Sequence, residues 1–242
     1  MDIVYLEARK RIEFNHSKID KDFFDELKDK NVCVIGTIQY LDFVVRLRDF
    51  LQSRGINVII FKGKHSKYDL QVLGCDVLDI NNDALTKLKH DVDVFVYVGD
   101  GTFHPKSLLF KFNKPVYCLN PITYKATKLD DTDVEAMLTR QKAALVKFLS
   151  SKHIGIIVTL KPGQNKLNLV NKYMEKVKAK FGDKEFYIFL DDTINFSELE
   201  NFSFIECFIN TACPRIAYDD TIKISKPVLD FSNLLKLIEQ DN

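Results

Sequence analysis

Residues 32–61, VCVIGTIQYLDFVVRLRDFLQSRGINVIIF, contain two short β-branched runs with a segment of helical period between them. The runs predict strands at Val32–Ile38 and Val58–Phe61, and the segment between them predicts a helix at Leu41–Ser53. A strand, a helix and a second strand in this order form the unit from which parallel sheets with covering helices are built. The sequence therefore predicts a doubly wound α/β fold.

The same alternation continues to the C-terminus. Further strands are predicted at Val94–Val98, Val116–Leu119, Ile154–Leu160, Phe186–Leu190 and Ile205–Asn210, and further helices near Asp83–Lys89, Pro105–Phe112, Asp133–Ser150, Leu167–Phe181, Ser197–Phe202 and Phe231–Glu239. The polar stretch Thr127–Asp133 separates two halves that could each close a core. We expect two small α/β domains with parallel sheets, residues 1–126 and 127–242.

The two halves also resemble each other. FVYVGDGTFHP begins at Phe95 and CFINTACPRIA at Cys207, an offset of 112 residues (207 − 95), and the same offset relates KPV at Lys114 to KPV at Lys226. A duplicated module explains this offset, and convergence on a common strand–loop–strand pattern is the alternative. The two domains are therefore expected to be related.

Composition indicates an ordinary globular protein and identifies no partner. Hydrophobic residues make up 46% of the chain, and 35 Lys and Arg balance 34 Asp and Glu without a long run of one sign. This balance provides no footprint for nucleic acid or an anionic membrane, and no apolar stretch approaches the roughly 20 residues that cross a bilayer. Five cysteines without an export signal indicate reduced thiols. We expect a cytoplasmic protein.

Two cysteines occupy stretches that predict loops beyond strand ends, where ligands bind in parallel sheets. Cys75, in QVLGCD, follows a glycine, and Cys213, in ACPR, precedes a proline. Cys-Pro occurs at iron–sulfur ligands but is a weak signal alone, and packing of a small side chain at a strand end is the alternative. Arg215 favours a site, because a guanidinium can lower a thiol pKa and hold a carboxylate. The other cysteines lie in strand runs and are expected in the core: Cys33, Cys118 and Cys207.

Two further loops carry polar groups. Gly99–Pro105, GDGTFHP, joins a strand to a helix expected to begin at its proline, and it contains Asp100 and His104. Its glycines allow close approach of a ligand, and a simple tight turn is the alternative. Lys161–Asn165, KPGQN, contains Gln164 but lacks both nucleotide-binding spacings. The absence of C-x-x-C, H-E-x-x-H and a nucleophile elbow disfavours structural zinc, zinc proteolysis and hydrolase chemistry.

Taken together, QVLGC, VGDGTFHP, VTLKPGQN, INTACPRIAYDD and SKPVLD resemble the radical subunit of diphthamide synthase, the archaeal 2-(3-amino-3-carboxypropyl)histidine synthase family. The resemblance runs from VYLEAR near the N-terminus to the final helix. It implies a family of three related α/β domains, each giving one cysteine to a 4Fe-4S cluster that binds S-adenosylmethionine. This chain resembles the second and third domains, and we expect the first domain to be absent. The motif match makes Cys75 and Cys213 two of the three cluster ligands.

The resemblance also implies an activity, that of a 3-amino-3-carboxypropyl transferase. S-adenosylmethionine would be cleaved to a 3-amino-3-carboxypropyl radical, which adds to a histidine of translation elongation factor 2 in the first step of diphthamide biosynthesis. Arg215 is expected to bind the methionine carboxylate, and Gln164, Asp100 and His104 are expected to contact the cofactor. The third cysteine would come from a separate chain in a homo- or hetero-oligomer, since Cys33 lies inside an apolar strand.

Two other functions remain open. The chain could be a non-catalytic scaffold or partner subunit of the diphthamide synthase complex. It could also be a small-molecule-binding α/β module without a cluster, in which Cys75 and Cys213 are unrelated.

Overall fold

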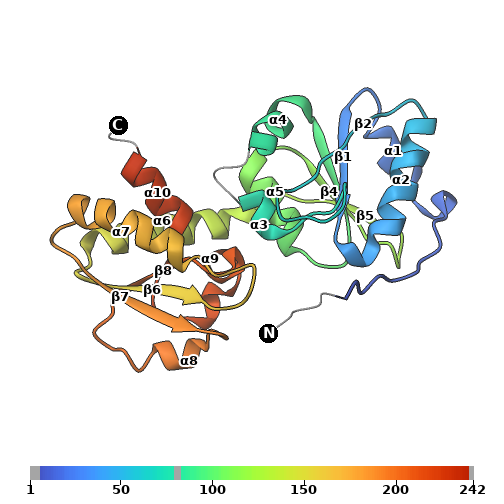
Figure 1. Cartoon of the computed structure of the whole chain (residues 1–242). Helices are drawn as coiled ribbons and strands as arrows, with labels where there is room; N and C mark the ends of the chain where they lie inside the picture. The colour runs from blue at the N-terminus through green and yellow to red at the C-terminus, as the bar shows by residue number, and fades with distance from the viewer. Residues whose placement is uncertain (1–5, 79–82, 240–242) are drawn as a thin grey trace. The chain divides into compact units, whose positions relative to one another are not determined.

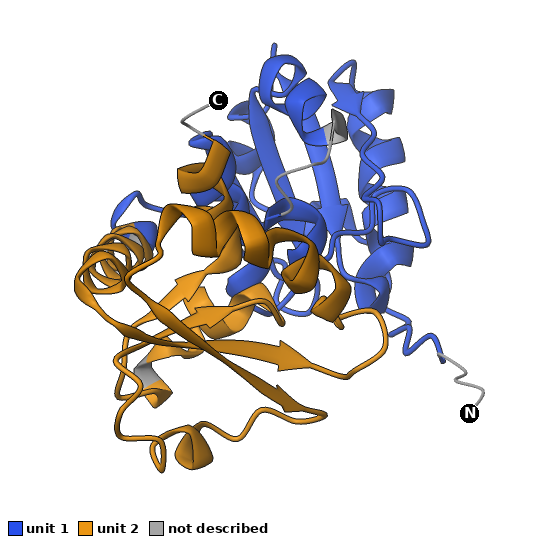
Figure 2. Ribbon diagram, turned by 60° about the vertical axis from the view of Figure 1, so that its left-hand side comes forward, with its two compact units in different colours: residues 1–134 blue, residues 135–242 orange. Residues whose placement is uncertain are grey.

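The computed structural model describes residues 6–78 and 83–239. Val4 and Tyr5 of the VYLEAR segment lie outside these residues. The chain divides into two compact units, Met1–Val134 (unit 1) and Glu135–Asn242 (unit 2), coloured separately in Figure 2. Each unit contains a sheet of its own, so the predicted α/β fold with two sheets is confirmed. Within the described residues, no helix has the length and apolar character that a membrane span requires.

Unit 1 is built on a five-stranded sheet with the order β2-β1-β3-β4-β5. Strands β1, β2, β4 and β5 are labelled in Figure 1. The first four strands in this order pair in parallel, and β5 is antiparallel to β4. Along the chain the elements are η1 (His16–Lys18), α1 (Lys21–Asp25), β1 (Asn31–Gly36), η2 (Ile38–Tyr40), α2 (Leu41–Ser53), β2 (Asn57–Ile59), α3 (Gly74–Leu78), α4 (Asp83–Asp91), β3 (Val94–Val98), α5 (Phe103–Phe112), β4 (Val116–Leu119) and β5 (Ala126–Lys128).

Helices cover both faces of this sheet, which explains the continuous apolar runs of its strands. All five residues of β3 are buried, as expected for a parallel strand with no solvent-facing side. On one face Val32 and Val96 belong to a core that includes the apolar stripes of α1 and α2. On the other face the Phe95 ring packs 4.9 Å from the ring of Phe112 in α5.

Unit 2 is built on a parallel four-stranded sheet with the order β7-β6-β8-β9. Along the chain its elements are α6 (Thr132–Ser150, which begins at the end of unit 1), β6 (His153–Thr159), α7 (Leu167–Lys180), β7 (Glu185–Asp191), α8 (Phe196–Leu199), β8 (Cys207–Asn210), α9 (Pro214–Tyr218), η3 (Asp220–Lys223), β9 (Val228–Asp230) and α10 (Phe231–Glu239). Edge-to-face contacts of Phe148 with Phe181, and of Tyr173 with Phe231, join α6, α7 and α10.

The two sheets repeat one topology, because β2, β1, β3 and β4 occupy the same order as β7, β6, β8 and β9. The strand registers refine the offset read from the sequence. Pairing of Phe95 with Val116 corresponds to pairing of Phe208 with Val228. The offset is therefore 113 (208 − 95) for β3 and β8, one residue more than the sequence predicted, and 112 (228 − 116) for β4 and β9.

Some local predictions were wrong. The stretch around Cys75 is the short helix α3 rather than a loop, and α5 begins at Phe103, two residues before the predicted start at Pro105. The stretch after residue 125 contains β5, which exists because Leu119 of β4 pairs with Ala126. Long-range contacts create these elements, and a local pattern does not encode them.

Candidate functional site

In unit 1 the QVLGC segment lies beside the carboxyl end of β1. Gly36 donates its N–H to the Leu70 carbonyl at 3.0 Å, and Val72 donates its N–H to the Gly36 carbonyl at 2.9 Å. These two bonds extend the sheet by one bridge, between Gly36 and Gln71. Cys75 follows in the first turn of α3, half-buried, at the edge of the sheet where parallel strands present ligand sites.

The neighbouring carboxylate, Asp76, organises the chain around this cysteine. Asp76 is fully buried and accepts hydrogen bonds from the His65 N–H at 2.6 Å and from the Ser66 hydroxyl. A Cβ at Gly63 would lie 2.1 Å from an Asp76 carboxylate oxygen, so only glycine fits there. Asp76 thus ties residues 63–66 to α3 and fixes the position of Cys75.

The structure brings two of the predicted loops of unit 1 together. A Cβ at Gly74 would lie 2.6 Å from Cε1 of Phe103, so the helix carrying Cys75 packs directly on the start of α5. The half-buried His104 ring stacks on Tyr97 with centroids 5.9 Å apart and contacts Phe103 edge to face. QVLGC and GDGTFHP therefore form one packed cluster.

Asp100 connects this cluster to the loop after β1. Its exposed carboxylate accepts a hydrogen bond of 2.7 Å from the Tyr40 hydroxyl. Burial and this hydrogen bond raise the pKa of Tyr40 to about 12, so the phenol stays protonated and donates. Sequence reasoning did not identify Tyr40, because its partner is 60 residues away.

In unit 2 Cys213 occupies the N-cap position of α9, immediately after β8. Its backbone is extended, with φ −61° and ψ 127°, and Pro214 takes the first helical position, where no N–H is needed. Asn210 Nδ2 donates to the Cys213 carbonyl at 3.0 Å, and the Thr211 hydroxyl donates to the Ile157 carbonyl at 2.8 Å. The half-buried Cys213 is therefore held on the end of β8 by side chains of the motif itself.

Arg215 is exposed in the first turn of α9. Its Nε lies 2.9 Å from Asp219 Oδ2 and 3.7 Å from Asp220 Oδ2. These acids hold the guanidinium near the end of the short helix, two residues from Cys213.

Gln164 lies in an exposed loop after β6, the strand next to β8. The loop turns through Gly163, whose φ is +78°, and the Gln164 N–H donates to the Lys161 carbonyl at 3.0 Å. Because β6 and β8 are neighbours, the KPGQN and ACPR loops leave the same edge of the sheet.

A buried polar network beneath α9 was not identified from the sequence. Gln141 Nε2 donates to the carbonyls of Ala217 and Val228 at 2.7 and 3.1 Å, and its Oε1 accepts from the Asp230 N–H at 3.0 Å and from Asn233 Nδ2 at 2.9 Å. Burial raises the pKa of the Asp230 carboxyl. The SKPVLD motif ends at Asp230, and it was the sequence feature that could have indicated this network.

The cysteines differ in accessibility. Cys33 and Cys207 are buried, as predicted, and burial raises the pKa of both thiols, that of Cys207 to about 12. Cys75, Cys118 and Cys213 are half-buried, so the prediction that Cys118 lies in the core was wrong. Within residues 6–78 and 83–239, no three His, Cys, Asp or Glu side chains gather into a group able to hold a metal ion.

Comparison with known proteins agrees with these motifs. The family model described as "Putative diphthamide synthesis protein" matches residues 1–241. The chain belongs to the diphthamide synthesis protein family.

Among relatives in this family is a 2-(3-amino-3-carboxypropyl)histidine synthase of Pyrococcus horikoshii. It is 30% identical over 201 residues, which cover 83% of this chain and 55% of the relative. A 2-(3-amino-3-carboxypropyl)histidine synthase subunit 1 of Neurospora crassa is 29% identical, covering 88% of this chain and 46% of the relative. The chain thus spans about half the length of these diphthamide synthesis proteins.

Solved structures of the family show the same fold. The crystal structure of Dph2 from Pyrococcus horikoshii matches with a TM-score of 0.77 and 25% identity, over 96% of this chain and 64% of that one. A structure of the same Dph2 with a 4Fe-4S cluster matches with a TM-score of 0.72 and 27% identity, over 90% and 59% of the two chains.

Proposed function

We propose that this chain takes part in the first step of diphthamide biosynthesis, transferring the 3-amino-3-carboxypropyl group of S-adenosylmethionine to a histidine of translation elongation factor 2. One observation supports this most. The two cysteines of the family motifs are half-buried, each in or beside the first turn of a short helix at a strand end, whereas Cys33 and Cys207 are buried. Their environments suit ligands, and those of the buried pair suit packing.

The donor chemistry of these residues fits a 4Fe-4S cluster as an incomplete set. Cys75 and Cys213 would hold two irons as thiolates, and a bound cluster would supply the electron needed to break the sulfonium bond. We propose that a separate chain supplies the third thiolate.

The other polar residues would bind and orient the substrate. Arg215, two residues from Cys213, would hold the methionine carboxylate in bidentate fashion, in place of its ion pair with Asp219. Gln164 from the neighbouring loop, with Asp100 and His104 of unit 1, would make further polar contacts. Tyr40 would keep Asp100 in place through its hydrogen bond.

Anaerobic reconstitution with iron and sulfide tests the ligand assignment. The whole chain, alone and mixed with a polypeptide carrying the first family domain, is loaded and its iron–sulfur absorbance and electron paramagnetic resonance spectrum are recorded. Cys75→Ser and Cys213→Ser should each abolish or strongly reduce the chromophore. Cys118→Ser is the matched control, since Cys118 is also half-buried but lies within β4. Equal loading of all three variants would refute the assignment.

Transfer itself is measured with carboxyl-labelled S-adenosylmethionine and elongation factor 2. Label in the factor, dependent on a reductant and on both cysteines, is the expected result. A reconstituted complex that forms without transferring label would favour the scaffold function, in which the chain stabilises an active partner.

A further inference from the structure

The N-terminal segment of unit 1 packs on the loop that follows β2. This segment contains LEAR, the described part of the VYLEAR motif, at residues 6–9. The Glu7 carboxylate accepts hydrogen bonds of 2.6 Å from both Lys67 Nζ and the Tyr68 hydroxyl. Arg9 Nε donates to the other carboxylate oxygen of Glu7 at 2.9 Å, and the Arg9 guanidinium lies over the Tyr68 ring, 4.8 Å from its centroid. These hydrogen bonds, that of Lys67 first, lower the pKa of Glu7 to about 2, so the carboxylate stays ionised at neutral pH.

The same segment is bonded to the chain that follows β1. Arg9 Nη1 donates to Asp42 Oδ1 at 2.7 Å, in the first turn of α2. The Lys10 N–H donates to the Gln39 carbonyl at 2.8 Å. Residues 6–10, the N-terminal strap, therefore bridge the two segments that leave the carboxyl ends of β1 and β2.

The loop under the strap contains a strained residue. Leu70 has a φ of +63°, in the left-handed region that residues with a side chain rarely adopt. Its side chain is buried, its N–H donates to the Phe61 carbonyl at 2.7 Å, and its carbonyl accepts a hydrogen bond from the Gly36 N–H. A strained conformation of this kind persists only where the surrounding contacts enforce it. The contacts around Leu70 therefore fix the course of the chain into QVLGC, which begins at the next residue.

Gln71 connects the strap to this strained turn. Its side-chain oxygen, Oε1, accepts hydrogen bonds from the backbone N–H groups of Lys67 and Tyr68 at 3.0 and 3.1 Å. The side chains of the same two residues bind Glu7. Gln71 is buried, and Cys75 lies four residues further along the chain. A path of hydrogen bonds and short chain segments therefore runs from Glu7 to Cys75.

We propose that Glu7 and Arg9 are positioning residues for Cys75. They hold the loop from the outside, as the buried Asp76 holds it from the inside, and so keep the thiol at the edge of the sheet. The inference rests on the proposed function, in which Cys75 is a cluster ligand.

Labelling of the thiols in the iron-free chain tests the proposal. Cys75 is half-buried, so a loosened loop should expose it to iodoacetamide. Glu7→Gln keeps an acceptor for Tyr68 but loses the attraction of two cations, and it should raise the labelling rate of Cys75 about two- to fivefold. Glu7→Lys adds a cation beside Lys67 and should raise the rate about tenfold or more. In the double variant Glu7→Lys/Lys67→Glu the ion pair is restored, and the rate should return toward that of the wild type.

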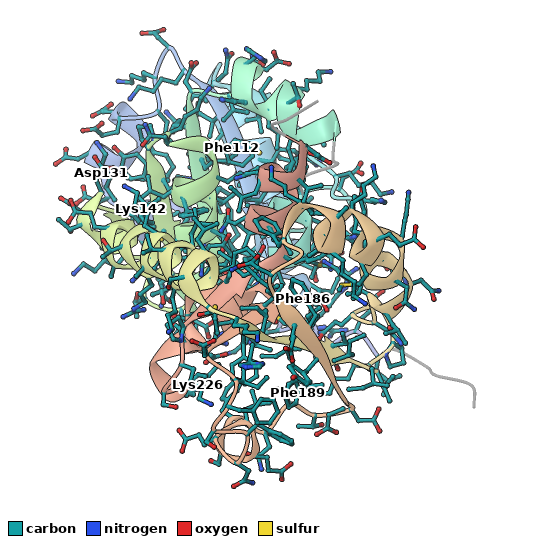
Figure 3. All side chains as sticks on the ribbon, turned by 90° about the vertical axis from the view of Figure 1, so that its left-hand side faces the viewer. Phe112, Asp131, Lys142, Phe186, Phe189 and Lys226 are labelled. Atoms are coloured by element: carbon teal, nitrogen blue, oxygen red, sulfur yellow. The ribbon has the colours of Figure 1, made fainter. Side chains whose placement is uncertain are left out.

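Two controls separate positioning from general stability. Cys213, in unit 2, is the internal reference, and its labelling rate should be the same in every variant. Asp131→Asn is the matched variant, because it removes one negative charge from an exposed acid of unit 1 (Asp131 is labelled in Figure 3). It should leave the labelling of Cys75 unchanged, and Glu7→Gln should shift the urea midpoint no more than this control does. After reconstitution with iron and sulfide, Glu7→Lys should show a weaker iron–sulfur absorbance than Asp131→Asn.

Unchanged labelling of Cys75 in Glu7→Lys would overturn the proposal, as would a charge swap that fails to restore the rate. Equal acceleration of Cys75 and Cys213, with a lowered urea midpoint, would show that the strap only adds stability and would also overturn it. Because the labelling uses the chain without iron, its result is independent of the proposed function. Normal cluster loading by Cys75→Ser would refute that function and leave the labelling result as it is.

Discussion

Replacing Gln141 by leucine should destabilise unit 2 and loosen the short helix that follows Cys213. The side chain is buried and makes four hydrogen bonds, two donated by Nε2 and two accepted by Oε1. Leucine fills a similar volume but makes none of them, which leaves the Ala217 and Val228 carbonyls and the Asp230 N–H without this partner.

The expected loss follows from the number of bonds. A buried hydrogen bond contributes about 1 kcal/mol net, and a group left unsatisfied costs about 1–3 kcal/mol. Loss of four bonds lowers the free energy of unfolding by about 4 kcal/mol, and the greater apolar burial of leucine offsets part of this loss. We expect the free energy of unfolding to fall by about 2–4 kcal/mol, a large fraction of the ~5–15 kcal/mol that stabilises a typical domain.

Urea unfolding and native-state hydrogen exchange measure this effect. The Asp230 amide should lose protection in Gln141→Leu, because its acceptor is gone. The matched control is Gln52→Leu, at an exposed glutamine of α2, which should change stability by less than about 0.5 kcal/mol. If Gln141→Leu unfolds at the same urea concentration as the wild type, with Asp230 still protected, the network does not hold α9 in place.

Three further results are expected. Labelling of the native chain with a maleimide at about pH 8 should modify Cys213 and spare Cys207, because burial raises the pKa of the Cys207 thiol to about 12. Mass spectrometry of the peptides measures the labelling of each cysteine, and rapid labelling of Cys207 would contradict the prediction. Gly74→Ala should lower the free energy of unfolding by about 1–3 kcal/mol, because the added Cβ would lie 2.6 Å from the Phe103 ring. Thermal unfolding measures this loss, and an unchanged melting temperature would show that α5 shifts to make room for the methyl group. Burial raises the pKa of Asp230, so the folded chain holds that proton more tightly than the unfolded chain, and stability falls as pH rises from the ordinary aspartate range through the raised value. Asp230→Asn should remove this part of the pH dependence, measured by unfolding at several pH values, and an identical profile would contradict the assignment.

The sequence predicted the central strands of the two sheets well because they are buried on both faces, whereas the short edge strands β5 and β9 were not predicted. The bounds of β3 and β4, and those of α2 and α10, match the predicted ranges. Strong local patterns marked these elements: strands buried between helices leave no polar alternation, and α2 repeats apolar residues every three to four positions.

Elements and contacts made by distant residues could not be predicted in this way. The helix α3 has five residues, too few for a periodic signal, and it is held by the buried Asp76 and by packing on Phe103. Likewise, the hydrogen bond from Tyr40 to Asp100 depends on the juxtaposition of two strand ends. Sequence reasoning therefore found the loops but not the side chains that fix them.

The shared strand order has a consequence for the history of the two thiols. Cys75 follows β2 along the chain, whereas Cys213 follows β8, whose counterpart in unit 1 is β3. If one ancestral module gave rise to both units, the cysteines are not descendants of one ancestral residue. In that case duplication copied the scaffold, and each thiol would have been gained or lost separately afterwards. A member of the family could thus lose one of these cysteines without disturbing the sheet that carries the other.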